Sequence, residues 1–103
     1  MDEARRSRAD ALEAARRIVD PQTQARVLGE IAATQARGGD MDGALVTARR
    51  IVEPWAQARV LGKIAEAQAR GGDMDGALKT ARRIADPQAQ AGALREIAVA
   101  QAT

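Results

Sequence analysis

The chain has 103 residues, with no cysteine, no histidine and a single aromatic residue, Trp55. These absences exclude disulfides and thiolate metal sites, and they remove the commonest catalytic base and metal ligand. Sixteen basic residues nearly balance fourteen acidic ones, and a net charge of +2 gives weak support for a polyanion partner. No apolar run approaches a membrane span and residues 1–20 are charged throughout, so we expect a soluble, cytoplasmic protein.

A 33-residue repeat organises the chain. Residues 11–43 and 44–76 are identical at 25 of 33 positions, and residues 77–103 form a third, shorter copy. Residues 1–10 precede the first copy as an extension that begins the first helix. A fixed period of this length is typical of stacked supersecondary units. We therefore expect one all-α repeat domain over residues 1–103. The near-identity of the copies indicates recent duplication or design.

Apolar residues recur at helical spacing in two stretches of each unit. Asp40 is placed to cap one helix, Glu53 before Pro54 caps the next, and Gly71 ends it. The connections are only a few residues long, so successive helices must be antiparallel neighbours. In chain order, the sequence predicts six helices in three hairpins, over about residues 7–19, 21–37, 41–52, 54–70, 74–85 and 87–102.

These patterns resemble the tetratricopeptide repeat. The run 39–45, followed by Ala48, Ile51 and Pro54, is similar to the second half of that repeat. The large–large–small positions of its first helix are matched by Leu28, Ile31 and Ala32, by Leu61, Ile64 and Ala65, and by Leu94, Ile97 and Ala98. The period of 33 departs from the family's usual 34, and Gln35, Gln68 and Ala48 fill its aromatic positions. A HEAT-like helical array is the alternative within the same architecture.

The resemblance implies a right-handed α-solenoid whose first helices line a concave, peptide-binding groove. Arginine forms bidentate pairs with carboxylates, so such a groove would suit an acidic peptide. The Lys/Asn pattern of the family's carboxylate-clamp members is missing, and an ordinary polar surface is the alternative interpretation. Gly29 and Gly62 fall in the middle of these helices, where we expect the close approach of a neighbouring helix or of a ligand backbone, and helix packing is the favoured interpretation. The candidate groove residues are Arg26, Glu30, Arg37, Arg59, Lys63, Glu66 and Arg70.

Trp55 breaks the repeat, because glutamine stands at positions 22 and 88. It is a candidate interface anchor, since tryptophan is enriched at binding hot spots. Local packing or a deliberately placed fluorescence probe are equally good interpretations. The arginine pairs 16–17, 49–50 and 82–83 would align as a ridge on stacking, and this is the best nucleic-acid feature of the chain. A solvated face is favoured, because the total charge is small and aromatic residues for base stacking are absent.

The phase of the repeat affects its ends. We call the helices predicted over residues 21–37, 54–70 and 87–102 first-type helices, and the others second-type helices. The chain begins with a second-type helix and ends with a first-type helix. The two exposed ends should therefore complement each other, so that copies could join head to tail. The alternative, which we call the capping interpretation, is that the terminal helices are adapted to end the stack. Val60 and Gly62 become Ala93 and Arg95 in the last copy, which makes that helix more polar.

No converging pair of carboxylates and no catalytic motif is present, so we expect no enzyme activity and no cofactor or metal. The first functional hypothesis is a scaffold that binds a protein or peptide partner. The alternative is a self-assembling structural repeat, a homo-oligomer stacked end to end, or a designed repeat without a natural ligand. Weak nucleic-acid binding through the arginine ridge ranks third.

Overall fold

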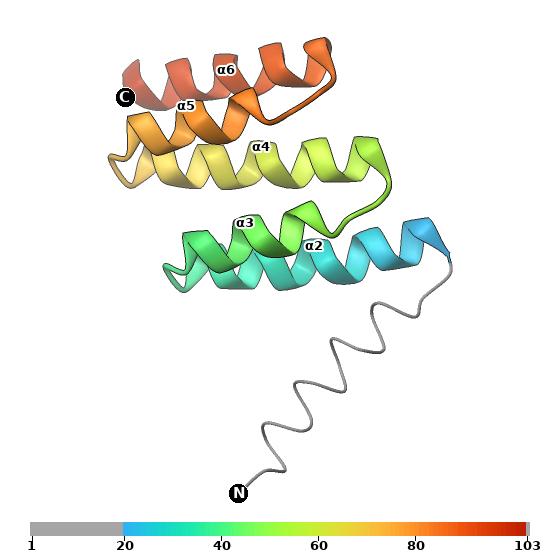
Figure 1. Ribbon diagram of the computed structural model, residues 1–103. Coiled ribbons are helices and arrows are strands. Elements are labelled where there is room, and N and C mark those ends of the chain that lie inside the picture. Colours follow the sequence, from blue (N-terminus) through green and yellow to red (C-terminus); the bar gives the residue numbers. More distant parts are fainter. Residues whose placement is uncertain (1–19, 103) are drawn as a thin grey trace, which may run out of the picture.

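The computed structural model describes residues 20–102, and within this range the chain is all-α, with no strand. Two helical hairpins are followed by a helix that packs on the second of them (Figure 1). The helices are α2 (Pro21–Arg37), α3 (Met41–Arg49), α4 (Pro54–Arg70), α5 (Met74–Arg82) and α6 (Pro87–Ala102). None of these five is both long and apolar enough to cross a lipid bilayer.

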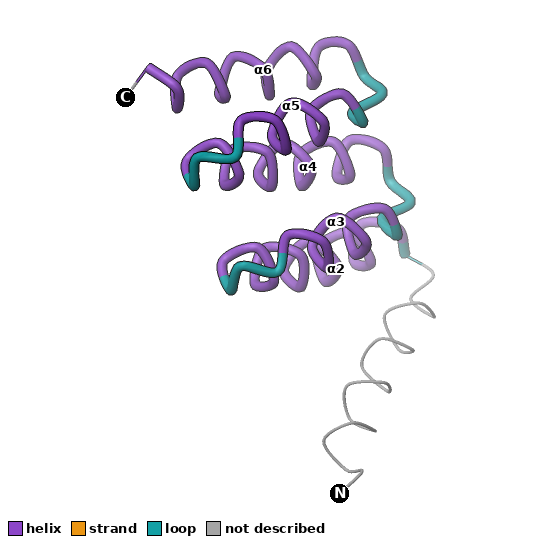
Figure 2. Tube along the Cα trace, turned by 60° about the vertical axis from the view of Figure 1, so that its left-hand side comes forward, coloured by secondary structure: helices purple, strands orange, loops and turns teal. Residues whose placement is uncertain are grey.

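The helices form two layers. α2, α4 and α6 lie side by side in one layer, and α3 and α5 pack against it without touching each other (Figures 1 and 2). Alanine dominates the core between the layers, with Ala32, Ala48, Ala65 and Ala81 fully buried. Because alanine has only a methyl group, the helices can pack closely with little core volume. Among the residues that the structure describes, the largest fully buried apolar side chain is that of Ile64 in α4.

The predicted bounds of α2, α4 and α6 are confirmed, and the helix predicted over residues 7–19 lies outside the described residues. The predicted ends of α3 and α5 are wrong, because these helices stop at Arg49 and Arg82 rather than at residues 52 and 85. The final turn of α3 tightens instead, since Ile51 N–H donates to the Ala48 carbonyl at 3.1 Å.

The early end of α3 follows from the proline at the start of α4. A residue before proline is driven out of the α region, and Glu53 is accordingly extended, with φ −79° and ψ 116°. The carbonyl groups that the shortened helix leaves open are bound by Gln57, whose Nε2 donates to the Ile51 carbonyl at 3.1 Å. In α6, Gln90 binds the end of α5 in the same way.

The predicted helix caps are confirmed. Asp40 Oδ1 accepts from Gly43 N–H at 2.9 Å, and Glu53 Oε2 accepts from Ala56 N–H at 2.7 Å. At the hairpin turns, Gly39 and Gly72 have φ of 89° and 92°, in the left-handed region that favours glycine. Two polar residues join the layers, because Thr80 Oγ1 donates to Gln68 Oε1 at 2.6 Å inside the core.

Candidate functional site

A groove of about 550 Å³ runs between α2 and α4, and we call it the α2–α4 groove. Both of its walls are first-type helices, which are the helices expected from the sequence to line a binding groove. Six of the seven candidate groove residues line it: Arg26, Glu30, Arg37, Arg59, Lys63 and Glu66. The seventh, Arg70, lies outside the lining and pairs with Glu66, its Nη2 being 3.6 Å from Oε2.

Small residues form the floor of the α2–α4 groove. Gly29, Ala33 and Ala67 lie among the charged positions of the two helices. A methyl group added at Gly29 would meet Cγ2 of Val60 at 3.3 Å, closer than most such contacts. The close packing expected at Gly29 is therefore confirmed, and its partner is the valine of the next first-type helix.

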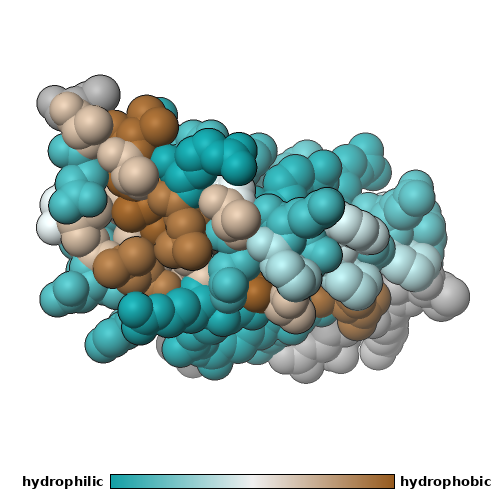
Figure 3. Space-filling view, turned by 90° about the horizontal axis from the view of Figure 1, so that it is seen from above, coloured by the Kyte–Doolittle hydropathy of each residue, from teal (hydrophilic) through white to brown (hydrophobic). Residues whose placement is uncertain are grey.

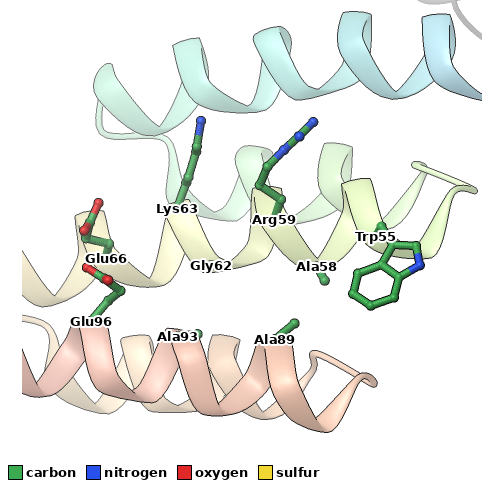
Figure 4. A pocket seen from close by; sticks show the side chains of 9 residues that line it. All are labelled: Trp55, Ala58, Arg59, Gly62, Lys63, Glu66, Ala89, Ala93 and Glu96. Carbon is green, nitrogen blue, oxygen red and sulfur yellow. The ribbon is translucent and has the colours of Figure 1, made fainter.

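The walls of the α2–α4 groove carry an excess of positive charge. Arg59 and Lys63 extend from α4 toward α2 (Figure 4). Arg26 and Arg37 are exposed on α2. Against these four cations stand only Glu30 and Glu66 in the lining. Glu66 pairs with Arg70, and Arg37 Nη2 donates to Thr34 Oγ1 at 3.5 Å, so the cations of the lining outnumber the carboxylates that could neutralise them.

A second depression of about 520 Å³ lies on the other side of α4, and we call it the α4–α6 hollow. Its floor is formed by Ala58, Gly62, Ala89 and Ala93. The Trp55 ring stands at one end, and the carboxylates of two glutamates, one on each helix, stand near the other (Figure 4). Sequence reasoning missed this hollow. The available signal was the replacement of Val60 by alanine at position 93.

The close packing expected at Gly62 is wrong. A methyl group added there would meet no atom within 4 Å, because the side chain that comes from α6 is Ala93 rather than a valine. Gly62 is half-buried in the floor of the α4–α6 hollow, so its lack of a side chain leaves space instead of admitting a helix.

Trp55 is 65% exposed at the N-terminal end of α4. Its ring lines the α4–α6 hollow and also a smaller depression of about 350 Å³ next to Leu61 and Ile84. Its backbone N–H donates to Glu53 Oε1 at 3.1 Å, so the cap fixes the backbone while the indole remains accessible. Arg59 lines both the groove and the hollow, but its side chain extends toward α2 whereas the Trp55 ring lies on the side of α6 (Figure 4).

At the start of α2, the pKa of the Asp20 carboxyl group is lowered by its neighbours. Thr23 Oγ1 donates to Asp20 Oδ2 at 2.6 Å, and this bond, with the Gln22 N–H and the charge of Arg26, lowers the pKa of Asp20. Among the described residues, no cluster of acidic side chains could hold a metal ion. The arginines of the pairs 49–50 and 82–83 are exposed, and the pair 16–17 lies outside the described range.

No family model matches this sequence, and neither a curated protein nor a solved structure matches it. The chemistry of the α2–α4 groove and the α4–α6 hollow is therefore the basis on which a function can be argued.

Proposed function

We propose that this chain is a non-enzymatic scaffold, a short right-handed α-solenoid of tetratricopeptide-like repeats, and that its α2–α4 groove binds an acidic segment of a partner protein. The observation that carries the proposal is the set of four cations over a floor of glycine and alanine. Small floor residues let a ligand backbone approach, and arginine side chains bind carboxylates through paired hydrogen bonds.

The spacing of the cations favours an extended peptide over a compact anion. Arg26 and Arg37 lie eleven positions apart on α2, which is about 16 Å at a rise of 1.5 Å per residue. A single phosphate or carboxylate cannot contact both ends of such a row. An extended peptide rises about 3.3 Å per residue, so roughly five residues would span it. Acidic side chains on alternate residues would then all point to the cationic wall.

The test is a binding titration with a defined probe. The probe is a fluorescein-labelled decapeptide in which glutamate alternates with alanine, and its matched control replaces each glutamate with lysine. We expect the glutamate peptide to bind and the lysine peptide not to bind. The affinity should fall steeply with added salt, because the contacts are between charged, exposed groups. Fluorescence anisotropy of the labelled peptide measures binding.

Two charge-reversal variants test whether the peptide binds in the α2–α4 groove. The double variant Arg59→Glu/Lys63→Glu should raise the dissociation constant of the glutamate peptide at least about tenfold, since it reverses one wall of the groove. The matched control is Arg50→Glu/Arg83→Glu, two exposed arginines that do not line the groove, and it should change the constant less than about threefold. Equal losses in both double variants, or equal binding of the lysine peptide, would reject the groove.

A further inference from the structure

Leu94 and Ala98 form an exposed apolar stripe on α6, which we call the outward stripe. The residues at the same repeat positions in α2 and α4 are buried. Leu28 in α2 and Leu61 in α4 are each 3% exposed, whereas Leu94 at the same repeat position in α6 is 38% exposed. The neighbouring alanines follow the same rule, because Ala65 is fully buried and Ala98 is exposed. Seen from the α6 end, apolar side chains gather in one patch (Figure 3).

In the two hairpins, this stripe is covered by the second-type helix that follows. α3 packs against α2, and α5 packs against α4. Each contact includes the same hydrogen bond between layers, from Thr47 to Gln35 at 2.7 Å and from Thr80 to Gln68 at 2.6 Å. Gln101 is the corresponding residue of α6, and it is exposed. α6 thus presents the apolar stripe and the glutamine that a second-type helix binds.

The chain contains one more copy of that second-type sequence. Residues 11–19 are identical to residues 44–52, which include most of α3, at seven of nine positions. They are identical to residues 77–85, which include most of α5, at six of nine positions. The alanines, the leucine and the isoleucine of the packing face are all retained. Only position 14 departs on the buried side, where Ala14 stands in place of Thr47 and Thr80.

We propose that residues 11–19 of a second copy of this chain bind the outward stripe of α6, in the register that α3 has on α2, so that copies join head to tail. Leu12 would then pack against the stripe, as Leu45 and Leu78 pack against the core in the hairpins. The contact is between two different surfaces, so an oligomer of any length keeps one unused surface of each kind and can grow further.

The chain's own residues 11–19 cannot reach this stripe. Ile18 is three positions before Pro21, the first residue of α2, and three residues span at most about 11 Å. α4 lies between α2 and α6, which have no contact of their own. Two helix–helix spacings of 8–10 Å therefore separate α2 from α6, about 16–20 Å. A segment 11–19 that covers this stripe must therefore belong to another molecule.

The polar substitutions of the last copy do not close this surface. Arg95 replaces Gly62, and Gly62 faces the α4–α6 hollow rather than the stripe. Ala93 replaces Val60 and is buried, as its counterpart is. The residues of the stripe itself keep their apolar character. The capping interpretation is therefore not supported on the face that a following helix would cover.

The experiment measures association of the full chain by sedimentation velocity from about 10 µM to about 1 mM. We expect the wild type to form species that grow with concentration beyond a dimer. Ala98→Glu blocks the stripe, and Leu12→Glu blocks the segment, so each variant alone should remain a monomer. An equimolar mixture of the two should form a heterodimer and nothing larger, because one intact pair of surfaces remains. That result is specific to a head-to-tail contact.

Matched controls change exposed residues outside the contact. Val99→Glu adds a charge to α6 at a position where α4 carries Glu66, and it should leave association unchanged. Glu13→Lys puts into the segment the residue that α5 carries at position 79, and it should have no effect either. Circular dichroism shows whether Ala98→Glu keeps the helix content of the wild type.

A gain-of-affinity variant keeps the proposal testable if a blocking variant does not fold. Ala14→Thr restores the hydroxyl that the other two copies have, and it should bond to Gln101 of the neighbouring molecule. One neutral hydrogen bond corresponds to about fivefold tighter association. Adding Gln101→Ala should remove that gain. A wild type that is monomeric at all concentrations, a mixture that does not dimerise, or an Ala14→Thr variant without tighter association would overturn the proposal.

Discussion

The two sides of α4 differ although they are built from the same repeat. On one side, Val60 of α4 fills the space over Gly29 of α2. On the other side, Ala93 of α6 does not reach Gly62 of α4, and a hollow of about 520 Å³ remains. Two interfaces with equivalent helices thus differ by the methyl groups of one side chain. The comparison teaches that the mid-helix glycine has no fixed role in this repeat, because its role depends on the residue that the next helix provides.

The two sides also differ in chemistry. The α2–α4 groove has Arg26 and Arg37 on one wall and Arg59 and Lys63 on the other. The α4–α6 hollow has alanines and Gly62 in its floor, Trp55 at one end and the carboxylates of Glu66 and Glu96 near the other. Arg59 and Lys63 line both depressions, but their side chains extend toward α2 (Figure 4). The positive charge of α4 is therefore directed to the groove, whereas glutamates of both helices stand at the hollow.

The largest effect is expected when the filled side is made like the empty one. Val60→Ala removes the two methyl groups that cover Gly29, and Val60 is 8% exposed. The lost burial and the space left behind should lower the free energy of unfolding by about 2 kcal/mol. Urea unfolding followed by circular dichroism measures the change. Val46→Ala is the control, because Val46 is 47% exposed and should cost less than about 0.5 kcal/mol.

A loss at Val60 no greater than at Val46 would show that the contact with Gly29 contributes nothing to stability. The two sides of α4 would then differ in shape alone.

A pair of glycine substitutions should separate the two sides more finely. Gly62→Ala places a methyl group in open space, so it should raise the free energy of unfolding by up to about 1 kcal/mol through helix propensity. Gly29→Ala has the same gain in propensity, but its methyl group would lie 3.3 Å from Val60, which must move. We therefore expect a smaller gain or a loss at Gly29. Equal gains at both positions, measured by urea unfolding, would contradict the difference in packing.

Much of the fold could be predicted from the sequence, because local rules determine it. The starts of α3 and α4 follow from the carboxylates of Asp40 and Glu53, and the hairpin turns follow from paired glycines. The early end of α3 could not be predicted from apolar spacing. Ile51 continues the apolar stripe, yet the turn before Pro54 and the amide of Gln57 decide where the helix stops.

The charged residues of the α2–α4 groove could also be predicted from the sequence, because helical periodicity puts them on one face of each helix. What the local sequence around each glycine could not give is the difference between Gly29 and Gly62. The five residues before each glycine are identical, and the first difference after it is the next residue, Glu30 or Lys63. The difference comes from Val60 and Ala93, which lie about thirty residues further along the chain, so it depends on how the helices stack.

The smallest effect concerns the start of α2, compared with the starts of α4 and α6. The three helices have Asp20, Glu53 and Asp86 as caps, but only α2 has a threonine three residues later, where the others have alanine. Thr23→Ala should therefore raise the pKa of Asp20 toward its ordinary value, because the main hydrogen bond that lowers it is lost. A carbon-detected NMR titration of the Asp20 carboxyl group measures this shift.

The pH dependence of stability independently tests the contribution of the Asp20 cap. The folded state lowers the pKa of Asp20, so the stabilising contribution of its carboxylate is fully present above about pH 4, the ordinary range of an aspartate pKa. It is lost as the pH falls through the lowered pKa of the folded state. Asp20→Asn should then be less stable than the wild type at pH 7, with the difference shrinking toward pH 2. Comparing the two proteins at each pH cancels the titration of the other carboxylates, and a difference independent of pH would mean that the charge of Asp20 does not contribute.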